Sequence, residues 1–372
     1  MRYYIIAGEA SGDLHGGNLI RALKQRDPQA EIRCWGGDLM EAAGATLVKH
    51  YRDLAFMGFV EVVANLPTIL RNMRFCKRDI LEFHPDVVVF IDYPGFNIPI
   101  STFAKSHGLK TVYYISPQVW AWKEGRVKTL MKTIDRMLVI LPFEQTFYQK
   151  WGWQVDYVGH PLVEEIARRR ADTSTENMIN KGHEPIVALL PGSRRQEIRQ
   201  KLPVMLEVAK HFPECRFVIA QAPGLEDAFL DPFTAGYPNV ERVKGATYNL
   251  LMKADAALVT SGTATLETAL FGVPEVVCYK GNPISYQIAK RLVRVPFISL
   301  VNLIMDRAVV RELIQDEMNT DNLVSELRGL LYDQVLRERL SADYASLQTI
   351  LAAGGKASEA AAEKIFELAT TN

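Results

Sequence analysis

The fold is decided by the stretch Ala256-Ala-Leu-Val-Thr-Ser-Gly-Thr-Ala-Thr-Leu-Glu-Thr-Ala-Leu-Phe-Gly-Val-Pro-Glu-Val-Val-Cys-Tyr279. Its first apolar run, residues 257–259, is typical of a buried parallel strand. Apolar residues then recur at helical spacing as far as Leu270, and Gly272 just beyond them is a C-cap signal. A second apolar run, residues 276–278, predicts the next strand. The stretch therefore reads as strand, turn, helix and strand, the repeating unit of a parallel α/β sheet.

The turn inside this stretch predicts an anion site. It combines hydroxyls with a glycine: Ser261, Gly262, Thr263 and Thr265. Free backbone N–H groups at a helix N-terminus, at the carboxyl end of a parallel strand, bind anions such as a diphosphate. Glu267, one turn into the helix, is placed to accept hydrogen bonds from a ribose diol. The alternative is an ordinary capped helix.

A second turn of the same kind lies upstream. Residues 185–190 predict a strand that opens a new sheet, and Pro191-Gly-Ser-Arg-Arg195 follows that strand into a helix. Ser193 and the backbone N–H groups supply donors to a pyrophosphate, and Arg194 adds bidentate charge. Alone, this segment would be interpreted as a surface turn with solvated arginines. Two such turns in one sheet favour a nucleotide site.

Composition excludes several classes of function. The chain has 372 residues, 48% of them hydrophobic, which suggests two domains with ample core. Lys+Arg and Asp+Glu both number 43, and the resulting zero net charge disfavours bulk electrostatic binding of nucleic acid. The sequence has no Asp-x-Asp pair and no histidines at ligand spacing, so we expect neither a metal nor another cofactor.

The expected compartment is the cytoplasm. Four scattered cysteines fit no zinc spacing and indicate a reducing environment. The apolar run at residues 3–7 is too short for a signal peptide, and no stretch approaches the roughly 20 apolar residues of a membrane span. We therefore expect a soluble or peripheral protein.

A glycine-rich loop, residues 8–17, follows the first predicted strand and enters a helix. It is neither a Walker A loop nor a dinucleotide fingerprint, although its glycines would let the backbone approach a ligand closely. Its polar side chains, candidates for ligand contact, are Glu9, Ser11, Asp13 and His15. The alternative is a capped loop, and capping is the favoured role for Asp13 taken alone.

Two further features are expected at the same edge of the first sheet. The β-branched run of residues 85–91 predicts a buried strand, and Asp92 at its carboxyl end is a candidate general base. The alternative role for Asp92 is to cap the helix that follows Pro94. Residues 116–122 form a rigid aromatic loop in which Trp120 suits contact with a sugar face or a lipid, or else fills the core.

Residues 53–82 differ in composition from their surroundings. The segment from Phe56 is densely apolar, and basic residues interleave with apolar ones after Pro67. The basic residues are Arg71, Arg74, Lys77 and Arg78. An apolar segment joined to a basic amphipathic helix can lie on an anionic membrane face, here from Phe56 to Arg78. The alternative is a core helix with solvated basic side chains.

The alternation of strands and helices predicts doubly wound parallel sheets in two domains. The polar and basic residues 162–184 read as the linker. We expect one domain over residues 1–165, a second over residues 185–345, and a C-terminal helical segment, residues 346–372, that returns to the first domain. A helical stretch is expected to begin at residues 311–315.

Five motifs occur in a fixed order along the chain. They are Gly-Glu-Ala-Ser-Gly-Asp at 8–13, Ser-Pro-Gln-Val-Trp-Ala-Trp at 116–122, Gly-His-Pro at 159–161, Leu-Leu-Pro-Gly-Ser-Arg at 189–194 and Ser-Gly-Thr-Ala-Thr-Leu-Glu at 261–267. Together they resemble the lipid-A-disaccharide synthases, a family of inverting glycosyltransferases, and the resemblance covers nearly the whole chain. It implies a GT-B fold, with two Rossmann-like domains facing a cleft and C-terminal helices packing back on the first.

The resemblance also implies a reaction. The donor would be UDP-2,3-diacylglucosamine and the acceptor 2,3-diacylglucosamine 1-phosphate, giving the β-1,6-linked disaccharide 1-phosphate and UDP. Asp92 would take the proton of the acceptor, and Arg194 would stabilise the departing diphosphate. The donor would lie on the second domain, where Asn302 and Glu312 resemble donor-site residues of the family. The acceptor would lie in the first domain, near the loop from Gly8 to His15 and Trp120.

Further expectations follow from the family. It implies peripheral attachment to the inner face of the inner membrane, which favours the membrane interpretation of residues 56–78, and a homodimer whose C-terminal segment exchanges between subunits. The sequence departs from the family twice: Gly95 replaces an acid, and Val301 replaces a proline beside Asn302. The alternatives are another UDP-sugar-dependent GT-B enzyme, such as a lipid glycosyltransferase or a UDP-sugar epimerase, and a non-catalytic nucleotide-binding protein.

Overall fold

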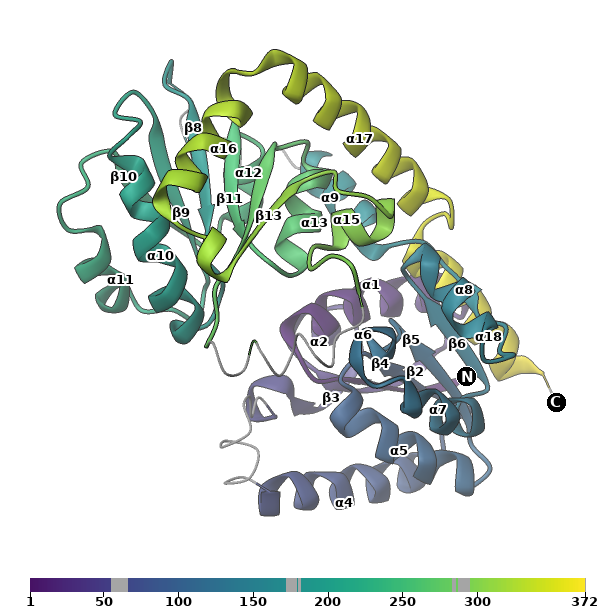
Figure 1. The fold of residues 1–372 in the computed structure, drawn as a ribbon. Coiled ribbons are helices and arrows are strands. Elements are labelled where there is room, and N and C mark those ends of the chain that lie inside the picture. Colours follow the sequence, from purple (N-terminus) through teal and green to yellow (C-terminus); the bar gives the residue numbers. More distant parts are fainter. Residues whose placement is uncertain (55–65, 172–178, 180–181, 283–285, 287–294, 372) are drawn as a thin grey trace. The chain divides into compact units, whose positions relative to one another are not determined.

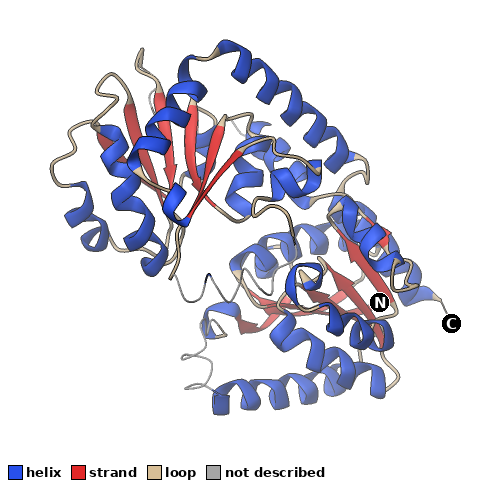
Figure 2. Cartoon of the chain, viewed as in Figure 1, coloured by secondary structure: helices blue, strands red, loops and turns tan. Residues whose placement is uncertain are grey.

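The chain forms two compact units. The computed structural model describes residues 1–371 except 55–65, 172–178, 180–181, 283–285 and 287–294. The first unit comprises Met1–Pro161 and Leu351–Asn372, and the second comprises Leu162–Ile350. Each is built on a parallel sheet with helices packed against it (Figure 2).

The first unit contains a seven-stranded sheet in the order β3-β2-β1-β4-β5-β6-β7, with every pairing parallel (Figure 1). The strands are β1 (Arg2–Ala7), β2 (Glu31–Gly36), β3 (Thr46–His50), β4 (Val87–Ile91), β5 (Lys110–Tyr114), β6 (Arg136–Val139) and β7 (Asp156–Tyr157). The chain moves outward from β1 in one direction and from β4 in the other. The carboxyl ends of β1 and β4 are therefore a topological switch point, where open α/β sheets bind ligands.

Helices cover both faces of this sheet. They are α1 (Ala10–Arg26), α2 (Asp38–Ala42), α4 (Leu66–Phe83), α5 (Pro94–Ser106), α6 (Val119–Trp122), α7 (Val127–Thr133), α8 (Pro142–Gln149) and α18 (Ala357–Thr370), with the 3-10 turns η1 (Tyr51–Asp53) and η2 (Glu124–Arg126). Alternate residues of β1 point to opposite faces. Tyr3 and Ile5 join the core under α1 and α18. Tyr4 and Ile6 join the core under α4, α5 and α7.

The second unit contains six parallel strands in the order β10-β9-β8-β11-β12-β13. They are β8 (Ile186–Leu190), β9 (Arg216–Gln221), β10 (Val240–Lys244), β11 (Ala256–Thr260), β12 (Glu275–Tyr279) and β13 (Arg311–Ile314). Its helices are α9 (Pro161–Ala171), α10 (Arg195–Ala209), α11 (Asp227–Thr234), α12 (Thr247–Leu251), α13 (Thr263–Leu270), α15 (Leu300–Met305), α16 (Thr320–Tyr332) and α17 (Gln334–Ala352), with the 3-10 turn η4 (Gln315–Glu317). Its switch point lies between β8 and β11.

The two links between the units run side by side within the first unit. The backbone N–H of His160 and the Tyr157 hydroxyl both donate to the carbonyl of Leu351, at 3.2 and 3.0 Å. A Cβ on Gly354 would lie 2.1 Å from the backbone N of Gly159. Glycine is therefore required there, because any side chain would separate the links. This packing gives the Gly-His-Pro motif a structural role.

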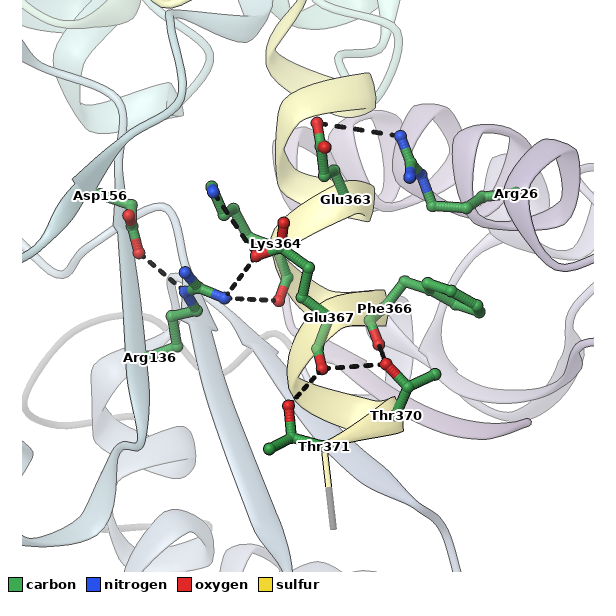
Figure 3. Close-up of polar contacts among 9 residues, drawn as sticks. All are labelled: Arg26, Arg136, Asp156, Glu363, Lys364, Phe366, Glu367, Thr370 and Thr371. Atoms are coloured by element: carbon green, nitrogen blue, oxygen red, sulfur yellow. Dashed lines mark hydrogen bonds and ion pairs between the residues drawn. The ribbon is translucent and has the colours of Figure 1, made fainter.

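Helix α18 completes the first unit, as predicted for the end of the chain, whereas α17, also expected to pack there, belongs to the second unit as far as Ile350. It packs along α1 and buries small side chains such as Ala361 and Ala362. Figure 3 shows Arg136 of β6 between Asp156 of β7 and Glu367 of α18, at 2.9 and 3.0 Å. This arginine ties the last helix to the edge of the sheet.

Two local expectations were wrong. Residues 162–171 belong to helix α9 of the second unit, not to a linker, because Glu165 is buried and paired with two arginines of its own helix, Arg168 and Arg169. Residues 311–314 form strand β13 rather than a helix. They pair in parallel with β12, and Leu313 is buried, so tertiary pairing overrides a locally neutral sequence.

Candidate active site

A pocket of 380 Å³ opens at the carboxyl ends of β8 and β11. Its lining residues come from the two predicted anion turns and their neighbours: Leu190, Gly192, Ser193, Arg194, Glu197, Ala220, Ala222, Thr247, Thr260, Ser261, Gly262, Thr263, Ala264 and Glu267. Because β8 and β11 are adjacent in the sheet, the two turns meet although their serines, Ser193 and Ser261, are 68 positions apart in the chain. Helices α10 and α13 both begin at this pocket, which favours a bound anion.

The turn after β8 is shaped by one glycine and one carboxylate. Gly192 has a φ of +107°, and a Cβ there would lie 2.4 Å from Oε2 of Glu197. The Arg194 side chain is 61% exposed and donates to Oε1 of Glu197 at 3.1 Å. Arg194 is thus a surface cation at the rim of the pocket, held by a carboxylate one turn along α10.

The turn after β11 uses its hydroxyls internally. Gly262 has a φ of +143°, a conformation open to glycine. Ser261 Oγ donates to the carbonyl of Ile298, and Thr265 Oγ1 donates to the carbonyl of Gly262, both at 2.9 Å. Thr265 is fully buried beneath the turn, so it shapes the site, whereas Ser261 and Thr263 line the pocket.

Glu267 lines the pocket with one oxygen already engaged. Tyr248 of α12 donates its hydroxyl to Oε1 of Glu267 at 2.7 Å. Burial raises the pKa of the Glu267 carboxyl, and the nearby Glu165 raises it further, while the Tyr248 hydrogen bond opposes both. The tyrosine fixes the orientation of the carboxylate that was predicted to meet a ribose.

Asn302 and Glu312 do not line this pocket but a separate one of 390 Å³. Asn302 is 1% exposed, and its amide bonds the backbone of Val309 and Val310 and the carboxylate of Glu312. Glu312 also accepts from the backbone N–H groups of residues 298 and 299. Both side chains therefore hold the loop that Ser261 bonds, instead of projecting into the first pocket.

In the first unit, Asp92 stands at the switch point in a strained conformation. Asp92 and Tyr93 both have positive φ, 42° and 50°. The Asp92 carbonyl accepts from Tyr113 Oη at 2.6 Å and from Asn97 Nδ2 at 2.7 Å, which holds the strained backbone in place. Strain of this kind collects at functional sites. Burial, reinforced by the charge of Glu9, raises the pKa of Asp92 to about 6, and a backbone hydrogen bond from Tyr93 opposes the shift.

The loop from Gly8 to His15 divides between site and scaffold. Glu9 is half-buried near Asp92, and Ser11 is exposed. Asp13 is buried and accepts from the backbone of Gly37, Leu39 and Met40, so it caps α2 and is not open to a ligand. His15 is buried close to His160, whose pKa falls to about 3 mainly through burial and also through His15.

Close packing requires glycine at two positions of this loop. A Cβ on Gly8 would lie 2.3 Å from the Tyr93 ring. A Cβ on Gly16 would lie 2.6 Å from Met40 Sδ. The glycines bring α1 against Tyr93 and α2, and so seat Glu9 beside Asp92.

Trp120 belongs to the core. It is 8% exposed, donates to Oε1 of Glu144 at 3.3 Å and meets Phe143 edge-on at 4.9 Å between ring centroids. Its burial favours the alternative that Trp120 fills the core, and Trp122, 52% exposed, is the aromatic side chain that the loop presents to solvent. Burial raises the pKa of Glu144 to about 7, against several hydrogen bonds.

Gly95, where the family pattern has an acid, lies in the first turn of α5 and is exposed. A Cβ there would meet nothing within 4 Å. An acid at this position would point outward at a helix N-terminus, where it would stabilise the helix. Its absence therefore leaves the role expected for Asp92 intact.

Several site residues were missed by sequence reasoning, because their partners are distant in the chain. Tyr248 lies 19 residues from Glu267, and Tyr113 lies 21 residues from Asp92. Lys201, buried near the first pocket, also carried no local signal. Within the described part of the chain, no group of three His, Cys, Asp or Glu side chains is placed to hold a metal ion.

Comparison with known proteins identifies the family. The family model described as lipid-A-disaccharide synthetase matches residues 3–366. The chain is 39% identical over 375 residues to a lipid-A-disaccharide synthase of Geobacter sulfurreducens, covering 99% of this chain and 97% of that protein. The chain belongs to the lipid-A-disaccharide synthetase family. A second member, from Syntrophus aciditrophicus, is 40% identical over 364 residues, with coverage of 96% and 95%. The family and the glycosyltransferase class predicted from five motifs are confirmed.

Solved structures resemble the chain at the level of fold. A UDP-GlcNAc 2-epimerase from Neisseria meningitidis, bound to UDP-GlcNAc, gives a TM-score of 0.71 at 12% identity, covering 99% of this chain and 100% of that one. A calicheamicin glycosyltransferase gives 0.62 at 18% identity, covering 99% and 98%. The chain has two α/β units, each built on a sheet of parallel strands. The GT-B fold predicted for this lipid-A-disaccharide synthetase family member is therefore confirmed.

Proposed function

We propose that the enzyme transfers 2,3-diacylglucosamine from UDP-2,3-diacylglucosamine to 2,3-diacylglucosamine 1-phosphate with inversion. The products are the β-1,6-linked disaccharide 1-phosphate and UDP. Family membership supports the reaction, and the observation that carries its chemistry is Asp92, strained at a switch point with a pKa of about 6. A carboxyl with such a pKa is ionised at neutral pH and still basic enough to act as a general base.

Each unit takes one part of the reaction in this proposal. The first, the acceptor and membrane-associated unit, binds the acceptor near Glu9, Ser11 and Asp92. The 6-hydroxyl of the acceptor attacks the anomeric carbon of the donor, and Asp92 takes the proton of that hydroxyl. The bond between the anomeric carbon and the UDP oxygen breaks. The second unit binds UDP in the 380 Å³ pocket, where two helix N-termini and Arg194 stabilise the negative charge on the leaving diphosphate. No cofactor is needed.

The test is release of UDP by purified protein in detergent with EDTA. UDP release that requires both acylated substrates, with formation of the disaccharide, is the expected result. Release from the donor alone would support the alternative of a UDP-sugar hydrolase or of an epimerase that also hydrolyses its substrate, a class that the likeness to an epimerase fold keeps in view. Without release, only nucleotide binding would remain.

We also propose peripheral attachment to the inner face of the inner membrane through residues 56–78. Residues 56–65 lie outside the described part of the chain, so the support comes from α4. Its outer side exposes Leu66 and Leu70, 48% and 45% exposed, beside Arg71, Arg74 and Arg78. This combination suits an anionic lipid surface. Among the described residues, no helix is long and apolar enough to cross a bilayer.

A homodimer is the last part of the proposal, and it rests on the family resemblance. Sedimentation velocity in detergent would measure it directly. A single species with the mass of one 372-residue chain would argue against it.

A further inference from the structure

A lysine lies buried beside the nucleotide pocket and takes no part in the mechanism described above. Lys201 of α10 is 4% exposed, although lysine is rarely buried without a partner. Its Nζ donates a hydrogen bond to Oγ1 of Thr260. Thr260 ends strand β11 and lines the pocket, whereas Lys201 itself lies behind it.

The chemistry of the pair fixes the direction of the threonine hydroxyl. An ammonium has three donors and no acceptor, so Thr260 Oγ1 must accept from Lys201. The hydroxyl proton is then left for donation to another group. Because Thr260 lines the pocket, the oxygens of a bound diphosphate are suitable acceptors. The lysine also places positive charge in a poorly solvated position, where its field is less screened than in water.

The two cations at this site therefore differ. Arg194 is 61% exposed and pairs with Glu197 at the rim, so water and salt screen much of its charge. Lys201 lies one helical turn beyond Glu197, on the same side of α10, and is shielded from solvent. Its position is set by packing before any ligand arrives.

We propose that Lys201 is a positioning residue for the diphosphate of the donor: through Thr260 it directs a hydroxyl donor into the pocket and supplies a fixed positive charge behind it. The inference rests on the proposed function, because it takes the 380 Å³ pocket as the nucleotide site. It adds a buried recognition pair to the helix N-termini and Arg194.

The charge of Lys201 gives the pair a pH signature. Burial lowers the pKa of Lys201, Glu197 opposes the shift and Arg194 adds to it, whereas Cys278 of β12 would oppose it only as a thiolate. Burial raises the pKa of Cys278 to about 12, so this thiol stays protonated up to pH 10. As pH rises through the lysine pKa, Nζ loses its charge and the affinity for UDP falls. An arginine at this position would not titrate.

The experiment is calorimetric titration of UDP and of uridine into the full-length enzyme and four variants. Lys201→Met and Thr260→Val each remove one member of the pair, Lys201→Arg keeps the charge, and Lys210→Met removes an exposed lysine at the end of the same helix. Lys201→Met and Thr260→Val should each weaken UDP binding by roughly 10-fold or more, the usual effect of losing a charge-assisted hydrogen bond. Uridine, which lacks the diphosphate, should bind all forms equally.

Two further readouts separate positioning from simple structural support. A fifth variant, which combines Lys201→Met with Thr260→Val, should bind UDP about as weakly as Lys201→Met alone, because the two residues act as one unit. Between pH 7 and 10, UDP affinity should fall for the wild type, and it should stay level for Lys201→Arg where that variant folds.

Three outcomes would overturn the inference. UDP binding by Lys201→Met at wild-type strength would show that the lysine is not used. Equal loss of UDP and uridine would mean a structural role only. A wild-type enzyme that does not bind UDP would remove the donor-site assignment itself, and that result is distinguishable because it needs no variant.

Discussion

Asp92 is the general base of the proposed reaction, and its replacement is the first prediction. Asp92→Asn keeps the shape of the side chain but removes the base, so kcat should fall roughly 100- to 10,000-fold, the usual contribution of general base catalysis. UDP binding should be unchanged, because the nucleotide pocket is in the other unit. Asp53→Asn, at a carboxylate 57% exposed in the same unit, is the matched control. Comparable activity in Asp92→Asn and the control would remove Asp92 from the mechanism.

The same residue sets the pH dependence of the wild type. The base acts only when ionised, so kcat/KM should rise with pH and level off above the Asp92 pKa of about 6. High pH favours loss of the proton from Asp92. The fall in kcat/KM therefore lies on the acid side of the pH profile. A profile flat from pH 5 to 8 would place the rate-determining proton transfer elsewhere.

Arg194 is tested against its neighbour. Arg194→Ala should lower kcat by roughly 100-fold, as loss of one group that stabilises developing charge does, and leave the melting temperature unchanged because the side chain is exposed. Arg195→Ala is the control, since that guanidinium pairs with Glu226 and lies 5.0 Å over the Phe229 ring. If both variants lose activity equally, the effect comes from general charge and not from Arg194.

These residues illustrate what the sequence could reveal. Asp92, Arg194 and Ser261 could be predicted as candidates because each follows an apolar strand, and parallel strands bring their carboxyl ends to one edge. The sequence could not show that Thr265 and Asn302 turn inward to bond backbone carbonyls and amides, because that depends on packing. Lys201 was missed for the same reason.

Glu275, at the start of β12, is a buried carboxylate that is expected to destabilise the fold when it is ionised. It is 1% exposed, and neither carboxylate oxygen has a hydrogen-bond partner. Burial raises its pKa well above the ordinary value, so the folded state holds the proton more tightly than the unfolded state. The contribution of protonated Glu275 to the free energy of unfolding is therefore fully present below pH 4 and is lost as pH rises through the pKa of the folded state.

Glu275→Gln removes this titration. Its melting temperature should exceed that of the wild type at pH 8, and the difference should shrink as pH falls toward 4. Thermal unfolding across that range measures it. A difference in melting temperature that stays the same at every pH would mean that Glu275 does not change its protonation on unfolding.

At the scale of elements, α4 has two sides with separate roles. Its inner side is anchored by Asp79, which accepts from the Tyr4 hydroxyl at 2.6 Å and pairs with Arg33 at 2.7 Å. The Tyr4 hydroxyl also accepts from Trp35 Nε1 at 2.8 Å. This buried network holds the helix on the sheet and leaves its arginines on the exposed side, where Arg78 pairs with Glu82 at 3.6 Å.

Neutralising that surface should weaken membrane binding without unfolding the enzyme. Arg71→Gln, Arg74→Gln and Arg78→Gln together should reduce binding to anionic vesicles roughly 100-fold, at about 1 kcal/mol for each charge near the lipid. Sedimentation with vesicles measures the loss. The control replaces three exposed basic residues of the second unit: Arg199, Lys210 and Arg328. Equal loss in the control would mean that α4 is not the membrane face.

Element type was easier to predict than element environment. The apolar runs and helix caps placed most strands and helices, but residues 311–314 carry no strong local preference and become a strand by pairing with β12. Trp120 shows the same limit, because its burial depends on Glu144 and Phe143 of α8. The sequence pattern predicts whether a segment is a helix or a strand where its preference is strong. Pairing and burial depend on the elements that it packs against.

The whole molecule is organised by two crossings of the chain between its units. The crossings lie together where Gly159 meets Gly354, and the second carries the chain to α18. The core of the first unit is therefore completed by residues from the end of the sequence: Ala361, Ala362, Ile365 and Ala369. This dependence could not be read from the Gly-His-Pro motif, because its glycine partner lies almost 200 residues away.

The structure makes a definite prediction about which chain supplies α18. Arg26 of α1 and Glu363 of α18 form an ion pair at 3.8 Å within one chain (Figure 3). Arg26→Cys with Glu363→Cys should therefore be joined by a short bis-maleimide into a product with the mass of one chain. The four natural cysteines are buried and should react slowly, and each single variant serves as a control. Because α18 begins five residues after α17 ends, packing within one chain needs only a short connection. A cross-linked dimer at high dilution would instead establish the exchange of C-terminal segments that the family resemblance implies.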